Sequence, residues 1–247
     1  MPTSRRAVTE AIILAAGNGD RFADPHNRSK LLHEMAGRPL IGRTLSAAYA
    51  AGIRHAHVVV GYQSAQIAAA CRALTPRGLR LSFYVNDAWH LENGVSVLAA
   101  RRAAPRRFAV LMGDHVFSPA ILARMLTLPA APDESALAVD RRLQDEALVR
   151  EATRVLTDRH RVLVIGKGIE HFDALDTGLF VCDGALFDAL DASCAEGDTT
   201  LTGGVRLLAR AGLVRAVPIG RARWFDIDTP DDLRAAEAAE LAYGAVV

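Results

Sequence analysis

Short apolar runs along the chain alternate with segments in which apolar residues recur at helical spacing. Several of the runs are apolar on both faces, which is typical of inner strands in a sheet that is covered on both sides. The alternation predicts an α/β fold of three layers, Rossmann-like, with a mostly parallel mixed sheet. In the first half of the chain the pattern predicts strands at 11–15, 57–61, 79–86 and 108–112, and helices at 41–51, 64–74 and 93–104.

The second half of the chain is less regular, and charged turns join its predicted strands. A helix closes it, with Thr229 as the expected N-cap and two aspartates in the first turn. No internal repeat, low-complexity segment or linker marks a second domain, so we predict one domain over residues 1–247. The pattern predicts strands at 137–141, 147–156, 162–165, 178–182 and 214–218, and helices at 185–190, 205–211 and 230–243.

The stretch AIILAAGNGDRFADPHNRSK, residues 11–30, combines a buried strand, a glycine-rich turn and two separated cations. Gly17 and Gly19 lack Cβ atoms, so their backbone can adopt positive φ and turn amide groups towards an anion. Arg21 offers a planar fork for terminal phosphate oxygens, and Lys30 offers a point charge. The stretch predicts a binding site for a nucleoside triphosphate. An ordinary strand-to-helix turn with two surface cations is the alternative that these residues leave open.

Two commoner phosphate-binding motifs are excluded by their spacing. The dinucleotide-binding fingerprint requires a third glycine where this chain has Phe22, and the P-loop pattern that ends in Gly-Lys-Ser or Gly-Lys-Thr does not occur. In sheets of this kind, ligands bind beyond the carboxyl ends of the strands. We therefore predict a nucleotide-binding half at about 8–130 and an acceptor-binding half at about 131–247.

Two aspartates follow predicted strand ends in different halves of the chain. Asp114 follows Leu-Met-Gly, and Asp226 follows Trp-Phe. Both can reach the same edge of the sheet, where they would face the phosphates. Mg²⁺ is typically bound through one or two carboxylates together with phosphate oxygens, so Asp114, Asp226 and Asp228 are predicted metal ligands. Turn or capping roles for these aspartates stay open.

The polar residues Asp176 and Thr177 directly precede the strand predicted at 178–182. Lys167 lies between two glycines upstream of them. These three residues are candidates for lining an acceptor pocket. A turn closed by an aspartate side chain, together with a solvated lysine, explains them equally well.

The eight histidines are dispersed along the chain. His55 and His57 are better explained as the start of a strand than as ligands. His115 adjoins Asp114 but has no partner histidine at metal-binding spacing, so we expect it to lie behind the ligands rather than among them.

Composition narrows the function mainly by exclusion. The chain has 29 basic and 28 acidic residues, well mixed, with a net charge of +1, which argues against a nucleic-acid partner. No signal peptide or membrane-spanning stretch is recognisable, so a soluble cytoplasmic protein without membrane insertion is expected. The cysteines form no CxxC pair and indicate neither a disulfide framework nor a cysteine-rich zinc site; they are Cys71, Cys182 and Cys194.

Several segments resemble the signature segments of sugar-phosphate nucleotidyltransferases: LAAGNGDRF, SKLL with AGRPLI, the Gly-Asp pair at 113–114 and the closing WFDIDTPDDL. Within that superfamily, six further segments resemble the CTP:inositol-1-phosphate cytidylyltransferase family. They are ND with NGVS, RFAVLMGDHVFS, VDR, EAT and FDALDTGLF. The likeness runs from about 11 to 233. It implies the nucleotidyltransferase form of the α/β fold and transfer of CMP from CTP to inositol 1-phosphate, with Mg²⁺ as cofactor.

The resemblance also implies roles for matching residues. Arg21 and Lys30 would be the catalytic cations, with Lys30 near the α-phosphate and the acceptor phosphate. Asp176 and Thr177 would contact the polyol. Nucleotide-binding roles are implied for Leu14, Ala15, Ala16, Gly17, Asn18, Gly19, Asn86, Asn93, Gly94 and Ser96.

The chain departs from the family pattern in the phosphate loop. Asp20 replaces the usual threonine or serine before the arginine, and the link from Arg21 to Lys30 differs from the short form that ends in Pro-Lys. In known fused proteins a membrane synthase follows this domain, whereas this chain stops at Val247. A partner synthase is therefore expected as a separate polypeptide, and a homodimer stays open.

The implied reaction is attack by the acceptor's phosphate oxygen on the α-phosphorus of CTP, with release of pyrophosphate. A phosphate monoester is mostly dianionic at neutral pH, with a second pKa of about 6, so no general base is required. The alternatives are a transferase of the same fold for phosphocholine, a phosphonate or a hexose 1-phosphate, and a nucleotide-binding module without catalysis. Choline would need an aromatic cage, and aromatic residues make up only 6% of the chain.

Overall fold

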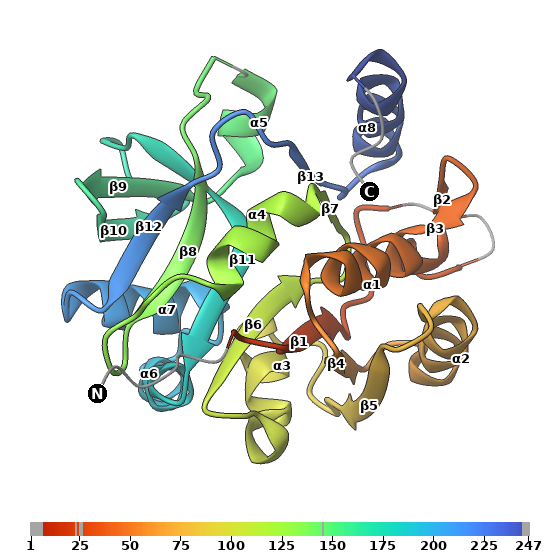
Figure 1. Ribbon diagram of the computed structural model, residues 1–247, viewed down its shortest axis with the longest axis horizontal. Coiled ribbons are helices and arrows are strands. Elements are labelled where there is room, and N and C mark those ends of the chain that lie inside the picture. Colours follow the sequence, from red (N-terminus) through yellow and green to blue (C-terminus); the bar gives the residue numbers. More distant parts are fainter. Residues whose placement is uncertain (1–6, 23, 25–26, 145, 244–247) are drawn as a thin grey trace.

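A nine-stranded mixed sheet runs through the protein, with helices on both of its faces (Figure 1). The computed structural model describes residues 7–22, 24, 27–144 and 146–243. The strand order is β5-β4-β1-β6-β11-β8-β12-β10-β9, and β11 also pairs with β9. The strands are β1 (Glu10–Ala15), β4 (His55–Val60), β5 (Arg80–Val85), β6 (Arg107–Met112), β8 (Ser135–Asp140), β9 (Arg154–Asp158), β10 (Arg161–Gly166), β11 (Ala174–Asp183) and β12 (Val214–Pro218).

The sheet is mixed, as predicted, but it is parallel throughout only in the first half of the chain. The strands β5, β4, β1 and β6 are parallel neighbours, and β12 is parallel to β8. The long strand β11 runs antiparallel to β6, β8 and β9, and β10 runs antiparallel to β12 and β9. Helical crossovers connect the first four strands and permit parallel pairing, whereas a short turn makes β9 and β10 a hairpin.

Eight α-helices are described. The helices predicted at 41–51 and 64–74 are observed almost as predicted, whereas the helix predicted at 93–104 ends at Ala99 and is followed by a separate 3-10 turn. None of the described helices has both the length and the apolar character needed to cross a bilayer. The helices are α1 (Leu40–Ala51), α2 (Ser64–Leu74), α3 (Asn93–Ala99), α4 (Pro119–Leu126), α5 (Glu146–Glu151), α6 (Ala185–Ala195), α7 (Leu201–Arg210) and α8 (Pro230–Tyr243), with single 3-10 turns η1 (Lys30–Leu32) and η2 (Arg101–Ala103).

The strand predicted at 147–156 is wrong over most of its length. The sequence EALVRE forms helix α5, and β9 begins only at Arg154. Alanine, leucine, glutamate and arginine are all good helix formers, so local propensity decided this segment. Two further elements, β7 (His115–Phe117) and α4, are observed where the sequence pattern predicted none.

Alternate residues of the central strands feed two apolar layers. Ile13, Val58 and Leu111 pack on one face of the sheet with α1, α2 and α4. The neighbouring residues Ile12 and Val59 pack on the other face with α3, α6 and α7. Both faces are therefore covered, as the apolar runs predicted.

Two small ribbons complete the fold: β2 (Glu34–Met35) pairs with β3 (Arg38–Pro39), and β7 pairs with β13 (Trp224–Asp226). A third apolar cluster joins the second ribbon to α8 and to the loop after β1 through Val116, Ala236 and Phe22. This cluster places the C-terminal part of the chain beside the first loop.

Candidate active site

The carboxyl ends of β1 and β6 lie side by side, and the loops that follow them border one cavity. The two strands are parallel, with Leu14 in register with Met112. The amide of Gly113 donates to the carbonyl of Leu14, which holds the turn after β6 against the start of the loop after β1. Asp114 follows directly and therefore lies beside that loop.

The β7–β13 ribbon brings the C-terminal region to the same place. Asp226 is in register with His115, and Trp224 with Phe117. The indole Nε1 of Trp224 donates to the carboxylate of Asp140 at the end of β8, with a distance of 2.9 Å. Asp226 consequently lies opposite the residue that follows Asp114, at the edge of the sheet that the sequence predicted for both aspartates.

The loop after β1 presents free amide groups. Gly19 has φ of +67°, and a Cβ atom added there would lie 3.0 Å from the Cβ of Lys30, so this position requires glycine. Within the described ranges, the amides of Gly17, Asn18 and Gly19 donate no hydrogen bond. Successive free amides beside a positive charge form an anion-binding concavity.

Lys30 is buried between two carboxylates. Its Nζ lies 2.8 Å from Oδ2 of Asp114 and 2.8 Å from Oδ1 of Asp228. Burial alone would lower the pKa of Lys30, but the two aspartates outweigh that effect and raise the pKa above its usual value. Arg21 binds the other oxygen of Asp228, so both predicted cations meet at one carboxylate.

His115 is a buried histidine between the two predicted metal ligands. Its Nδ1 donates to the carbonyl of Thr177 at 2.9 Å, and its Nε2 lies 3.3 Å from Asp226 and 3.9 Å from Asp114. Burial lowers the pKa of His115, but Asp226 and then Asp114 outweigh it and raise the pKa to about 9. With this pKa the ring is charged at neutral pH and acts as a counter-charge for Asp226.

Asp114 and Asp226 supply oxygen donors of the kind that Mg²⁺ prefers. Their nearest carboxylate oxygens lie within 4.8 Å of each other. Burial raises the pKa of Asp226, but His115, followed by Lys30 and Arg21, lowers it to about 2, so this carboxylate is ionised. Both residues fit a divalent cation bound through two carboxylates and phosphate oxygens.

Asp228 is placed differently from the role expected of it. Each of its two oxygens is bound by a cation, one by Arg21 and one by Lys30. The amide of Asp228 also donates to Asp232 at 3.1 Å, within the N-terminal turn of α8. In this arrangement Asp228 positions the two cations and offers no free oxygen to a metal.

The neighbouring residues Asp176 and Thr177 also differ in placement. Oδ1 of Asp176 accepts from the amide of Gly178 at 2.7 Å, and burial raises the pKa of Asp176 to about 6. Thr177 has no exposed surface, and its hydroxyl donates to the carbonyl of Ala138 in β8. The expectation that Thr177 contacts the acceptor is corrected: its hydroxyl joins β11 to β8 and does not reach the cavity.

Four of the residues to which the resemblance gives nucleotide-binding roles lie around the N-terminus of α3. Asn93 lines the cavity, and its Oδ1 accepts a backbone amide of α7 at 2.8 Å. The side-chain amide of Asn86 donates to the hydroxyl of Ser96 at 3.0 Å, and both side chains are buried. The backbone of Gly94 donates to the carbonyl of Thr199. Asn93 faces the cavity, whereas the other three assigned residues hold α3 in place.

A cavity of about 200 Å³ lies between these groups. Glu151 and Thr202 are among the lining residues that the sequence did not predict as site residues. Glu151 lies 3.7 Å from Arg21 and is marked in the sequence only by the family resemblance of its segment, while Thr202 arrives through the packing of α7 on α3. The predicted site residues that line the cavity are Arg21, Asn93, Asp114, Lys167, Asp176, Asp226 and Asp228.

Two cations, two carboxylates and a loop of free amides together suit a polyphosphate and a divalent cation. Residues 11–169 match the family described as the MobA-like NTP transferase domain. The chain belongs to this family. The nucleotidyltransferase character predicted from the sequence is thereby confirmed.

Relatives match almost the whole chain. A protein of Rubrobacter xylanophilus named bifunctional IPC transferase and DIPP synthase is 36% identical over 98% of this chain and 54% of its own length. A protein of the same name from Aquifex aeolicus is 30% identical over 93% of this chain and 51% of its own length. A CMP-5'-(3-aminopropyl)phosphonate synthase of Streptomyces rubellomurinus is 32% identical over 92% of this chain and 38% of its own length. The chain spans about half the length of the first two relatives.

Solved structures establish the nucleotidyltransferase fold. The inositol-1-phosphate CTP transferase from T. maritima superposes with a TM-score of 0.82 at 24% identity, covering 97% of this chain and 98% of that one. A UDP-glucose pyrophosphorylase complexed with UDP-glucose superposes with a TM-score of 0.81 at 17% identity, covering 95% and 99%. The predicted fold class is confirmed by both.

Proposed function

We propose that this nucleotidyltransferase transfers CMP from CTP to inositol 1-phosphate, giving CDP-inositol and pyrophosphate. The observation that carries the proposal is the position of Lys30, a buried cation between Asp114 and Asp228 and beside the free amides of the first loop. The choice of acceptor is supported by the relatives named IPC transferase and DIPP synthase, at 30 to 36% identity over more than nine-tenths of the chain.

In the proposed reaction, an oxygen of the acceptor phosphate forms a bond to the α-phosphorus of CTP. The bond from that phosphorus to the oxygen bridging to the β-phosphorus breaks, and its electron pair leaves with pyrophosphate. The acceptor is already mostly dianionic at neutral pH, because its second pKa is about 6. The buried His115 of the site is held between the carbonyl of Thr177 and the carboxylate of Asp226. Positioning and charge stabilisation are therefore the tasks left to the chain.

Each charged group has a proposed role. Lys30 neutralises charge that develops around the α-phosphorus, and Arg21 leaves Asp228 to bind the terminal phosphates. Asp114 and Asp226 would hold Mg²⁺, which when bound neutralises phosphate charge. Lys167 and Asp176, which also line the cavity, would bind the acceptor's phosphate and hydroxyl groups.

The proposed function is tested by a matrix of CTP, UTP, ATP and GTP against inositol 1-phosphate, phosphocholine, glucose 1-phosphate and 3-aminopropylphosphonate. Released pyrophosphate is measured with Mg²⁺ and with EDTA, and the product is identified by mass spectrometry. We expect CTP with inositol 1-phosphate to give the highest kcat/KM, and EDTA to remove the activity. Pyrophosphate release with CTP but a preference for another acceptor would keep the enzyme class and reject inositol 1-phosphate.

A phosphonate acceptor is the second candidate, because a relative at 32% identity is named CMP-5'-(3-aminopropyl)phosphonate synthase. Such an acceptor carries an amine in place of hydroxyl groups. The phosphonate arm of the matrix decides between the two. No pyrophosphate release with any pair would favour a nucleotide-binding module without catalysis.

A further inference from the structure

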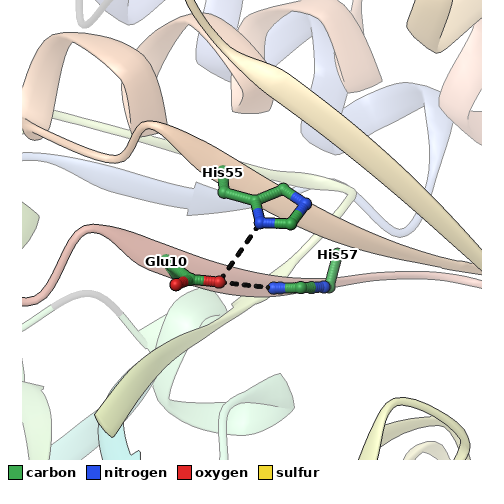
Figure 2. Close-up of side chains that lie close together, drawn as sticks. All are labelled: Glu10, His55 and His57. Carbon is green, nitrogen blue, oxygen red and sulfur yellow. Dashed lines mark hydrogen bonds and ion pairs between the residues drawn. The ribbon is translucent and has the colours of Figure 1, made fainter. Parts of the chain in front are cut away.

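Two histidines and a glutamate converge at the opposite end of the parallel strands from the catalytic cavity (Figure 2). Glu10, the first residue of β1, is in register with His55, the first residue of β4. His57 lies two residues further along β4 and therefore projects from the same face. Oε2 of Glu10 lies 2.8 Å from Nε2 of His57 and 3.2 Å from Nδ1 of His55. With a rise of about 3.3 Å per residue, the cluster is about 16 Å from the phosphate-binding loop at the other end of β1.

The remaining ring nitrogens of both histidines are held by hydroxyl groups of β5. Nε2 of His55 lies 2.9 Å from Oγ of Ser82, and Nδ1 of His57 lies 3.3 Å from the hydroxyl of Tyr84. A histidine that binds a metal through one nitrogen almost always has its other nitrogen held by a hydrogen-bond partner. The β5 hydroxyls meet that condition for both rings, and His57 is nine-tenths or more buried.

Arg80 supplies the positive charge that lies beside His55 in this structure. The guanidinium of Arg80 lies 3.0 Å from Nδ1 of His55, and because arginine can only donate, Nδ1 carries a lone pair. The same nitrogen faces Oε2 of Glu10, which is also an acceptor. The lone pair accepts from Arg80, and a metal ion that displaced the guanidinium could bind both Nδ1 and Oε2. Arg80 is exposed on β5 and can turn into solvent when such a cation binds.

We propose that Glu10, His55 and His57 form a binding site for a Zn²⁺-like transition-metal ion, separate from the catalytic magnesium site. The three ligand atoms lie within 4.8 Å of one another. Tetrahedral zinc with bonds of about 2.1 Å holds its ligands about 3.4 Å apart, which small side-chain rotations reach from the observed separations. A water molecule would complete the four ligands.

The two histidines and one glutamate of this cluster favour a transition-metal ion over the Mg²⁺ proposed for catalysis. Imidazole nitrogens suit zinc, copper and nickel, whereas Mg²⁺ prefers an all-oxygen octahedron. The ion would join β1 to β4 and, through Ser82 and Tyr84, to β5. It therefore stabilises the parallel half of the sheet and takes no part in the transfer reaction.

The test is a calorimetric titration of EDTA-treated full-length protein with ZnCl₂, together with thermal unfolding. It uses the Asp226→Asn protein, so that the cluster of Asp114, His115 and Asp226 does not take the ion. We expect one Zn²⁺ per chain and a higher melting temperature with Zn²⁺. His57→Gln and Glu10→Gln, each added to that background, should weaken binding at least tenfold and remove the thermal shift.

Two controls separate ligation from general damage to the fold. His160→Gln changes an exposed histidine between β9 and β10, at the other edge of the sheet (Figure 1), and should leave Zn²⁺ affinity unchanged. Arg80→Gln removes the competing cation and should tighten binding, a change that misfolding would not produce. The proposal is overturned if the background protein binds no Zn²⁺, if His57→Gln binds it as tightly, or if Arg80→Gln binds it more weakly. Circular dichroism confirms that each variant is folded.

Discussion

The Nζ of Lys30 and Oδ2 of Asp114 lie 2.8 Å apart, although one residue follows β1 and the other follows β6. The pairing depends on the parallel contact of those two strands, and Asp228 reaches the same ammonium group from the C-terminal region. Substrate phosphates that enter the site would meet a lysine that is already charged and oriented.

Replacing Lys30 with methionine should lower kcat roughly a hundredfold, about 3 kcal/mol of transition-state stabilisation, because one charged contact is lost. Asp114→Asn should have a similar effect, because Asp114 is one of the two ligands of the proposed Mg²⁺ site. Steady-state pyrophosphate release measures both. Lys167, the only other lysine in the sequence, is the matched control: Lys167→Met should raise the KM of the acceptor with a smaller change in kcat. A Lys30→Met enzyme with near wild-type kcat would remove this residue from the mechanism.

Stability should fall as the pH rises towards 9 because of His115. Its folded pKa, about 9, lies above the unfolded value of 6.5. The contribution is therefore fully present below pH 6.5 and is lost as the pH rises through 9, amounting to about 3 kcal/mol. Urea unfolding at pH 6, 7.5 and 9 in EDTA, compared between the wild type and His115→Gln, measures it. A difference between the two proteins that stays constant over this range would show that His115 does not titrate as described.

Replacing Asp176 should stabilise the fold but weaken the binding of the acceptor. The folded pKa of Asp176, about 6, lies above the usual 3.8, so its stabilising effect is present below pH 3.8 and is lost as the pH rises through 6. Asp176→Asn, which can still accept from Gly178, should therefore be more stable than the wild type at pH 7 by about 3 kcal/mol. The same change should raise the KM of the acceptor. Equal stability at pH 7 would contradict the burial of an ionised carboxylate.

Gly178→Ala should destabilise the protein by at least about 2 kcal/mol. The residue has φ of +72°, and an added Cβ would lie 2.4 Å from Cε1 of His115, so the substitution both strains the backbone and displaces the imidazole. Gly184→Ala is the matched control, because an added Cβ there meets no atom within 4 Å. Denaturant unfolding should show a larger loss of unfolding free energy for Gly178→Ala than for Gly184→Ala. Equal losses would indicate that the His115 side chain can move aside at little cost.

The parts of the fold that follow from the sequence are those with local periodicity. The helix predicted at 64–74 is α2, and the strand predicted at 214–218 is β12, because their apolar spacing matches a single element. The strand at 147–156 fails because an apolar run with helix-forming residues suits either element until its neighbours are known. The direction of β11 depends on partners in β6 and β8, which no local pattern of the chain reveals.

The candidate site shows the same division. A glycine pair followed by Arg21 and Lys30 is visible in one stretch of sequence. The hydroxyl of Thr177 turns away from the cavity because β11 pairs with β8, and Asp228 takes both cations because α8 begins beside it. The cluster of Glu10 with His55 and His57 arises from the register of β1 with β4, so its histidines could be recognised only as the start of a strand.

The β7–β13 ribbon has a consequence for how the enzyme can change over evolution. It sets Asp226, one of the two proposed metal ligands, directly across from His115, and its Trp224 also forms part of the cavity wall. Substitutions that reshape that wall for a new acceptor would therefore also move Asp226 relative to the nucleotide. New acceptor specificity is thus constrained to side chains that leave the ribbon's pairing intact.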